Sequence, residues 1–247
     1  MGYFVHHKPK RRITPKTNSH NSFQPLARPP IAANHNFDPD IMNNIDSRIR
    51  NAHMPGKAKV LTPQEVRNVK SNLKTPRDKL LFAVGLYTGL RISEIIAITH
   101  DQIYTASGGI RNSLKVTRLK KKNTVYSNIP IHPKLREQLI SYKKYTIDKM
   151  ADFGIESPWL FTSTDDPDEH IKRIRAHVIL SDAFAAAGVD GASSHSMRRT
   201  ALTLMSRAGI PLRTIQEISG HSNLSQLQEY LAVDPADSHK AIMSLKY

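Results

Sequence analysis

From residue 60 onwards, apolar residues recur with the three-to-four-residue spacing of helices that pack one face on a core. Thr62-Pro63 and Thr75-Pro76 each place a capping hydroxyl before a proline at the first helical position, and Glu65 completes a capping box at the first of them. The second segment ends at Gly89, and its apolar stripe consists of Leu80, Leu81, Val84 and Tyr87. The pattern therefore predicts one helix from Pro63 to about Leu73 and a second that ends at Gly89.

Residues 102–131 alternate instead with the period of strands. We expect strands at Leu114–Val116 and Val125–Ile131, joined by a basic turn at Lys120–Thr124. Arg91 opens a short helix through Ile98, and helical spacing returns at about 133–150, 170–187, 195–208, 211–218, 223–231 and 235–245. The expected fold class is therefore mainly α with a small antiparallel β-sheet, an α+β arrangement.

The first 58 residues have a different composition. Seven of the fifteen prolines lie in the first 60 residues, together with ten Lys and Arg against three Asp. We expect residues 1–58 to form a basic, Pro-rich arm or a truncated domain, and residues 59–247 to form the main domain. Within the latter, 235–247 is expected to be a C-terminal helix that docks either on a neighbouring subunit or on its own domain. A basic run in the arm is either a solvated charged segment or a phosphate contact: Lys8, Lys10, Arg11 and Arg12.

Charge and composition narrow the classes of function. The 36 Lys and Arg against 21 Asp and Glu give a formal net charge of +15, which favours a polyanionic partner, either nucleic acid or an anionic membrane surface. The absence of cysteine excludes disulfides, thiol nucleophiles and Cys-ligated metal sites. No stretch of the sequence approaches 18 apolar residues, and the N-terminus lacks the apolar segment of a secretory signal. We therefore expect a soluble protein of a reducing compartment.

Two segments place arginines at helix starts. In TGLRISEI (residues 88–95), Arg91 lies at the start of a helix. The alternative interpretation is an ordinary surface arginine that forms an ion pair with Glu94, three residues later. In HSMRRT (residues 195–200), His195 and Arg198 are three residues apart and share one helix face. A guanidinium beside an imidazole suits a phosphate site, although scattered basic residues at a helix start give the same pattern. Arg199 points to another face and is expected to contact solvent or the DNA backbone.

Two further segments carry reactive side chains. GHSNLSQLQEYL (residues 220–231) holds His221 in a tight loop and Tyr230 nine residues later on a short helix. The basic turn contains Lys120, Lys121 and Lys122. Taken alone, the tyrosine fits a half-buried core aromatic and the lysines fit a charged surface turn.

The order of these signals is more specific than any one of them. An arginine, a hairpin lysine, His-x-x-Arg, Gly-His and then a tyrosine resemble the catalytic domain of the tyrosine recombinases, also called the phage integrase family. The resemblance covers roughly residues 60–235. It implies six catalytic residues supported by the acidic Glu94: Arg91, Lys122, His195, Arg198, His221 and Tyr230. Lys120 and Lys121 stay open as alternatives for the hairpin lysine and are otherwise expected to bind DNA.

The resemblance also implies the chemistry, which is DNA strand transfer through a covalent 3′-phosphotyrosine on Tyr230. The two arginines would clamp the non-bridging phosphate oxygens, with His221 as a further donor. His195 would accept the phenolic proton, and Lys122 would protonate the departing 5′ oxygen. No cofactor and no metal are expected. The expected partners are double-stranded DNA with paired inverted repeats, three further copies in a homo-tetramer, and accessory proteins, with no membrane. The expected location is the cytoplasm, on the nucleoid of a bacterium or in the host of a mobile element.

Two other functions stay open. One is a DNA-binding regulator that keeps the fold without turnover, and the other is a tyrosine-type topoisomerase that relaxes supercoils without exchanging partners. The presence of all six catalytic residue types argues against the regulator. The target sequence, and the choice among integration, excision, inversion and plasmid resolution, cannot be read from these residues.

Overall fold

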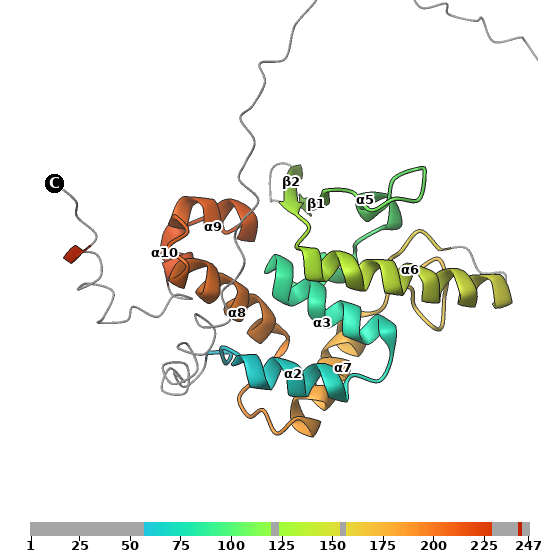
Figure 1. Ribbon diagram of the computed structural model, residues 1–247, viewed down its shortest axis with the longest axis horizontal. Helices are drawn as coiled ribbons and strands as arrows, with labels where there is room; N and C mark the ends of the chain where they lie inside the picture. Colours follow the sequence, from blue (N-terminus) through green and yellow to red (C-terminus); the bar gives the residue numbers. More distant parts are fainter. Residues whose placement is uncertain (1–56, 120–123, 154–156, 229–241, 244–247) are drawn as a thin grey trace, which may run out of the picture. The chain divides into compact units, whose positions relative to one another are not determined.

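The computed structural model describes residues 57–119, 124–153, 157–228 and 242–243 (Figure 1). The helices are α2 (Pro63–Asn72), α3 (Pro76–Thr88), α4 (Ile92–Ile96), α5 (His100–Ile103), α6 (Pro133–Phe153), α7 (Arg173–Ala186), α8 (Ser194–Arg207), α9 (Leu212–Ser219) and α10 (Leu224–Gln228). The strands are β1 (Ser113–Leu119) and β2 (Thr124–Pro130), which form a two-stranded antiparallel sheet. The expected α+β class, mainly helical with a small antiparallel sheet, is confirmed.

Helices α2 and α3 begin as their capping residues predict. Thr62 Oγ1 accepts a hydrogen bond from the Glu65 N–H, and Glu65 Oε2 accepts one of 2.8 Å from the Thr62 N–H. The Thr75 hydroxyl caps α3 by accepting a 3.1 Å hydrogen bond from the Asp78 N–H, and Gly89 ends that helix with a φ of +64°. The predicted helices are therefore present with bounds close to those expected.

Helix α3 lies in the middle of the helical part of the molecule, where it packs against α4, α6, α7 and α8 (Figure 1). Because neighbours surround it, its buried residues cover more than one face, and they include Leu80, Leu81, Phe82 and Val84. A Cβ added to Gly85 would lie 2.7 Å from Met197 Sδ, so this glycine lets α8 approach α3 closely. The contact fixes the position of α8, which carries His195 and Arg198.

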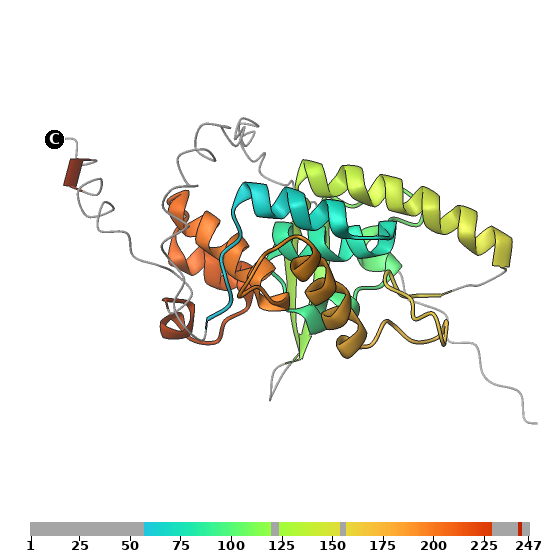
Figure 2. The same cartoon turned by 90° about the horizontal axis from the view of Figure 1, so that it is seen from below.

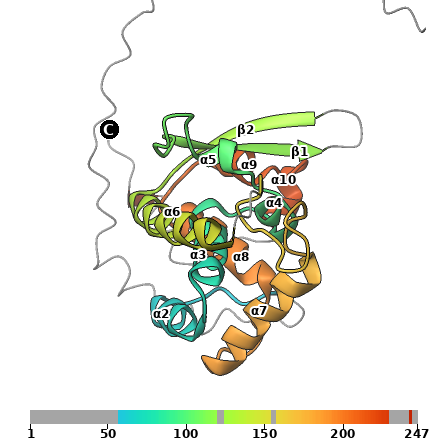
Figure 3. The same cartoon turned by 90° about the vertical axis from the view of Figure 1, so that its right-hand side faces the viewer.

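The hairpin lies along one side of the helices, next to α4, α5 and α9 (Figure 3). Its register runs from Ser113 opposite Pro130 to Leu119 opposite Thr124. Alternate residues of β1 face inward, so Leu114, Val116 and Arg118 are all buried. An arginine at the third of these positions interrupts an otherwise apolar row.

The last three helices of the main body lie together at one end, and α6 extends toward the other (Figure 2). Leu202 of α8, Ile215 of α9 and Leu227 of α10 form a small second core that holds these helices to one another. This packing positions the turn between α9 and α10, where His221 lies.

The structure differs from the expected elements at several positions. Strand β1 extends to Leu119, three residues beyond its expected end, and α4 ends at Ile96, two residues before its expected end. The one-turn helix α5 was not expected; it is a single turn in which Gln102 Oε1 accepts from the Thr99 N–H. Helix α7 begins three residues later than expected, and α6 extends three residues further. The expected helix at 235–245 lies outside the described residues except for 242–243. In the part of the chain that is described, no helix has the length and apolarity needed to cross a membrane.

Candidate active site

Glu94 holds Arg91 at the junction between α3 and α4. Arg91 is the N-cap residue of α4, and its backbone N–H donates a 2.7 Å hydrogen bond to Glu94 Oε2. Its Nη1 lies 3.4 Å from Glu94 Oε1. The Arg91 side chain is 40% exposed, whereas that of Glu94 is 12% exposed. The carboxylate therefore fixes both the backbone and the guanidinium while leaving the guanidinium accessible.

Arg198 is buried, with only 1% of its surface exposed. Its Nη1 donates to the Gly89 carbonyl oxygen at 2.7 Å, and its Nη2 donates to the Ser219 carbonyl oxygen at 2.9 Å. Gly89 is the C-cap of α3 and Ser219 is the last residue of α9, so both acceptors lie at the negative end of a helix dipole. Two helix ends therefore compensate the buried charge of Arg198.

His221 follows the turn that ends α9. Gly220 takes a φ of +69° there, and His221 is only 6% exposed. Burial and, to a smaller extent, the positive charges of Arg198, Arg91 and Arg118 together lower the pKa of His221 to about 4. The imidazole is therefore neutral at pH 7.

Hydrogen-bonding groups surround the neutral ring of His221. The Ser219 hydroxyl donates to the Gln216 carbonyl oxygen at 3.3 Å, and its oxygen lies 2.8 Å from His221 Nδ1. Arg198 Nη2 lies 3.1 Å from His221 Nε2 and 3.3 Å from Nδ1. The Gln216 side chain donates to the His221 carbonyl oxygen at 3.1 Å, so both ring and backbone are held.

His195 lies in the first turn of α8, capped by Ser193, and is exposed. Partial desolvation lowers its pKa, and the charges of Arg198, Arg173 and Arg91, with His177, act in the same direction. His195 is therefore also held neutral around pH 7, which is the form that accepts a proton.

The structure brings four of the predicted site residues together from distant parts of the chain. Arg198 contacts His221 directly, and the charge of Arg91 acts on both imidazoles. Arg91 and His195 form the accessible side of this cluster, and Arg198 and His221 form its buried side. The cluster has the composition of an anion site, with two guanidinium groups beside two neutral imidazoles.

The remaining predicted residues lie outside the described residues. These are Tyr230, the turn lysines Lys120, Lys121 and Lys122, and the arm residues Lys8, Lys10, Arg11 and Arg12. Strand β1 ends at Leu119, immediately before the turn lysines, and α10 ends at Gln228, two residues before Tyr230. Among the side chains that are described, no group of three or more His, Asp or Glu could hold a metal ion.

The Arg199 side chain is buried, whereas the sequence predicted an exposed side chain. Arg199 is 4% exposed, and its Nη1 donates a 2.7 Å hydrogen bond to the Ala58 carbonyl oxygen. The expectation that it contacts solvent or the DNA backbone is therefore wrong, because the face of α8 that carries Arg199 is covered by the segment leading into α2. Arg199 instead ties the start of the described domain to α8.

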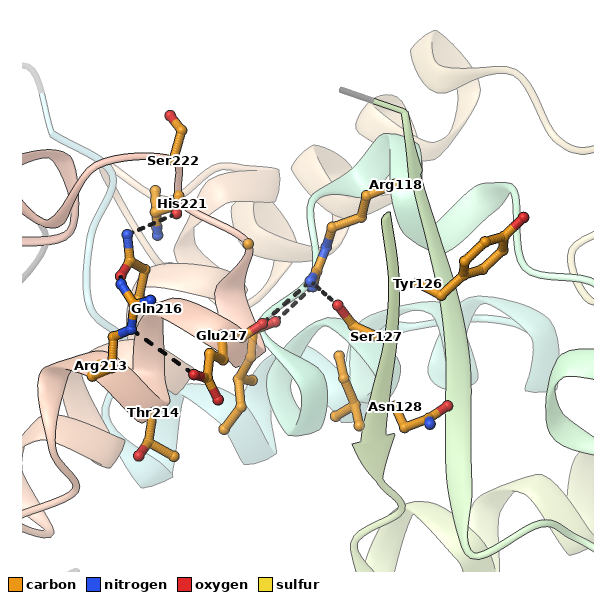
Figure 4. A pocket seen from close by; sticks show the side chains of 13 residues that line it. Arg118, Tyr126, Ser127, Asn128, Arg213, Thr214, Gln216, Glu217, His221 and Ser222 are labelled. Carbon is orange, nitrogen blue, oxygen red and sulfur yellow. Dashed lines mark hydrogen bonds and ion pairs between the residues drawn. The ribbon is translucent and has the colours of Figure 1, made fainter. Parts of the chain in front are cut away.

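The sequence patterns did not single out Arg118, which lies between the hairpin and α9 (Figure 4). It is 5% exposed, and its Nε lies 3.1 Å from Glu94 Oε1. Its Nη2 donates to the Ile218 carbonyl oxygen at 2.6 Å and its Nη1 to the Glu217 carbonyl oxygen at 3.3 Å. The signal for it was present in SLKVTRL, where an arginine occupies an inward position of an alternating strand.

Arg118 lines a cleft of about 570 Å³ between β2 and α9 (Figure 4). One wall is formed by hairpin residues, among them Ser127, and the other by the last turns of α9 and the turn that follows, which includes His221. Tyr126 at its rim points away from Arg118 and is 77% exposed. The cleft therefore extends from the exposed hairpin to the buried side of the cluster.

Comparison with known proteins agrees with this geometry. Residues 59–237 match the sequence profile described as the phage integrase family. The chain belongs to the phage integrase family. Tyrosine recombinase XerC of Caldanaerobacter subterraneus is 29% identical to this chain over 192 residues, which cover 74% of this chain and 49% of XerC. The chain therefore spans about half the length of that relative.

Solved structures show the same fold. The crystal structure of XerA recombinase superposes with a TM-score of 0.62 at 20% identity, covering 79% of this chain and 67% of XerA. The structure of XerH site-specific recombinase bound to its difH substrate superposes with a TM-score of 0.59 at 16% identity, covering 76% and 54% of the two chains. This phage integrase family member therefore has the catalytic-domain fold of the tyrosine recombinases.

Proposed function

We propose that this protein is a site-specific recombinase, which cleaves and rejoins DNA strands through a covalent 3′-phosphotyrosine on Tyr230. The observation that carries the proposal is the cluster of Arg91, His195, Arg198 and His221, assembled from the α3–α4 junction, α8 and the turn after α9. Membership of the phage integrase family and the similarity to XerC support it.

The two guanidinium groups stabilise the charge that develops during phosphoryl transfer. Attack on a phosphodiester places negative charge on the non-bridging oxygens, and positioned donors stabilise that charge by roughly 3–4 kcal/mol each. The exposed Arg91 is the first of the pair that an incoming phosphate meets, because Arg198 is covered. Arg198 and His221 then form the inner wall of the phosphate site.

The proton transfers follow from the pKa values. The phenol of tyrosine has a reference pKa of about 10, so Tyr230 needs a proton acceptor at neutral pH. His195 takes this role because its pKa is lowered and its side chain is exposed. Lys122 protonates the departing 5′ oxygen, with Lys121 and Lys120 as the alternatives on the same turn.

The substrate is double-stranded DNA that carries paired inverted repeats. The net charge of +15 supports a polyanionic partner, and the related XerH has been solved on its own DNA site. Strand exchange joins two duplexes and uses four active sites, so the protein acts as a homo-tetramer on DNA, in some settings with accessory proteins. Because the phosphotyrosyl bond conserves the energy of the phosphodiester, religation needs no cofactor.

A nicked duplex tests the proposal. The DNA that flanks the coding sequence is searched for paired inverted repeats. A duplex carrying that site is nicked close to the cleavage position, so that cleavage releases a short fragment with a free 5′ hydroxyl, which diffuses away and prevents religation. Wild-type protein should become covalently linked to a DNA 3′ end, and Tyr230→Phe should form no adduct. Tyr145→Phe is the matched control, because Tyr145 lies on α6, which contributes no residue to the cluster. Absence of the wild-type adduct, or an adduct with Tyr230→Phe, overturns the proposal.

A further inference from the structure

Arg118 connects the hairpin to two elements that border the cluster. It lies on β1, forms an ion pair with Glu94 on α4, and donates to two carbonyl oxygens of the last turn of α9. Its Nη1 also donates to Ser127 Oγ on β2 at 2.8 Å. A single buried guanidinium therefore contacts the hairpin, the helix that Arg91 begins and the helix α9, which ends two residues before His221.

The contacts with Glu94 and with the end of α9 each lead to a residue of the proposed phosphate site. Glu94 Oε1 lies 3.1 Å from Arg118 Nε and 3.4 Å from Arg91 Nη1, so one carboxylate oxygen is shared by both arginines. The last turn of α9 also accepts from Arg198, through the Ser219 carbonyl oxygen. Arg118 and Arg198 are thus held by successive carbonyl groups of the same helix end, whose dipole favours cations.

The chain around Arg118 is built to accommodate it. A Cβ added to Gly220 would lie 2.7 Å from Arg118 Nε and 2.8 Å from its Cζ, so only a glycine leaves room for the guanidinium at this turn. Gly220 also has a φ of +69°, which places His221 directly after the contact. The guanidinium therefore packs against the backbone that sets the direction of His221.

We propose that Arg118 is a positioning residue for DNA cleavage. It fixes the distance between the Arg91–Glu94 pair and the turn that contains His221, and it attaches both to β1, the strand that precedes Lys122 in the chain. The inference rests on the proposed function. Lysine cannot replace Arg118 in this role, because an ammonium is a point charge, whereas the planar fork reaches Glu94, Ser127 and the α9 carbonyls at once.

Two substitutions at this position separate geometry from charge. Arg118→Met removes both, and Arg118→Lys keeps the charge while losing the fork. Lys115→Met is the matched control, because Lys115 lies on the exposed face of the same strand. Single-turnover cleavage of the nicked duplex is measured at saturating protein. We expect Arg118→Met and Arg118→Lys each to slow cleavage about 100-fold, the usual effect of misplacing a reacting group by about 1 Å, and Lys115→Met to stay within about twofold of wild type.

The titration of His221 gives a readout that does not depend on cleavage. Among the described residues, three charged groups act on this imidazole: Arg198 from α8, Arg91 from the start of α4, and Arg118 from β1. Arg118→Met should raise the pKa of His221 measured by NMR on the full-length protein, with the signal assigned from a His221→Asn variant. Arg118→Lys should move it less, because the positive charge is kept.

The outcomes distinguish this inference from the proposed function. If wild type forms no adduct with DNA, the proposed function fails, and the pKa of His221 alone reports whether Arg118 acts on the turn. If wild type cleaves and Arg118→Met cleaves at the same rate, or Arg118→Lys restores the full rate, Arg118 is not a positioning residue. An unchanged His221 pKa in Arg118→Met overturns the inference in the same way. If circular dichroism shows that Arg118→Met is unfolded, the cleavage rate of Arg118→Lys tests the inference instead.

Discussion

At the scale of single residues, the cluster contains two kinds of basic side chain. Arg91 is exposed and is held by a carboxylate, whereas Arg198 is buried and is held by carbonyl oxygens at helix ends. Hydrogen bonds from a charged group stabilise the folded protein by about 1.5–3 kcal/mol, so these contacts fix the buried guanidinium firmly. The buried arginine therefore orients the inner side of the cluster, and the exposed one is accessible from solvent.

The lowered pKa of His221 predicts a loss of stability in acid. The folded-state pKa is about 4 and the reference value is 6.5, so between these values the unfolded chain binds a proton that the folded protein does not. The stabilising contribution is therefore present above pH 6.5 and is lost as the pH falls toward 4. Urea unfolding of wild type and His221→Asn at pH 7 and pH 5 checks this. Wild type should lose more unfolding free energy than the variant, with a slope of at most about 1.4 kcal/mol per pH unit.

His195 and other histidines keep part of this pH dependence in the variant, so the comparison rests on the difference between the two proteins. Equal losses for wild type and His221→Asn would contradict the assignment of a depressed pKa to His221. Binding of a phosphodiester should reverse the effect, because a neighbouring anion favours the imidazolium form.

At the scale of elements, the C-terminal ends of α3 and α9 supply the groups that hold the cluster in place. Gly89 at the end of α3 and Ser219 at the end of α9 supply the acceptors for Arg198. These helix ends exist because Gly89 and Gly220 both adopt positive φ angles, which ordinary residues adopt only with strain. The glycines thus shape the proposed anion site through the carbonyl groups that hold Arg198.

Gly89→Ala tests this role of the α3 terminus. The substitution should lower the free energy of unfolding by about 1–2 kcal/mol because of the positive φ, and its Cβ would lie 3.3 Å from Leu202 Cδ2. It should also slow DNA cleavage, because the Gly89 carbonyl oxygen that holds Arg198 moves. Urea unfolding and the nicked-duplex assay measure the two effects.

Gly209→Ala is the control for Gly89→Ala. Gly209 has a φ of +76°, and no atom lies within 4 Å of an added Cβ, so it carries the same backbone strain away from Arg198. It should lose similar stability and keep its cleavage rate at saturating DNA. Equal cleavage rates for the two variants would show that the α3 terminus does not position Arg198.

At the scale of the whole molecule, hydrogen bonds attach residues 58 and 59 to the rest of the described domain. The Ala58 carbonyl oxygen accepts from Arg199, and the Lys59 N–H donates to the Gly191 carbonyl oxygen at 3.1 Å. Residue 58 thus contributes to the packing of α8, so a truncation intended to remove only the arm should stop at residue 56.

Deletion of residues 1–56 should weaken binding to duplex DNA and flatten its salt dependence. This segment carries eight Lys and Arg against three Asp, and each lost phosphate contact lowers the slope of log K against log salt by about 0.9. Fluorescence anisotropy at several salt concentrations measures the slope. Deletion of residues 1–58 should in addition lower the midpoint of thermal unfolding, because it removes the acceptor of Arg199. A slope unchanged by the shorter deletion would show that the arm makes no phosphate contacts.

Local signals in the sequence were strong enough to place most elements. The Thr-Pro starts of α2 and α3 and the glycine at the end of α3 were predicted because capping acts between residues a few positions apart. Arg199 was misplaced because its burial depends on Ala58, 141 positions away in the chain. The short helix α5 was missed because a single turn carries too few residues to show a period.

The sequence by itself determined most of the helices, the hairpin, the basic charge and the order of residues that marks the phage integrase family, because all of these depend on near neighbours or on residue types along the chain. Only the tertiary structure decided which basic side chains are buried and what holds them. Arg118, Glu94, Arg198 and His221 belong to four separate segments, and their contacts arise when the ends of α3 and α9 meet beside the hairpin. The packing of these helix ends beside the hairpin holds charged side chains, which usually lie on the surface, in fixed positions. Their buried charges are stable there because carbonyl oxygens and a carboxylate surround them.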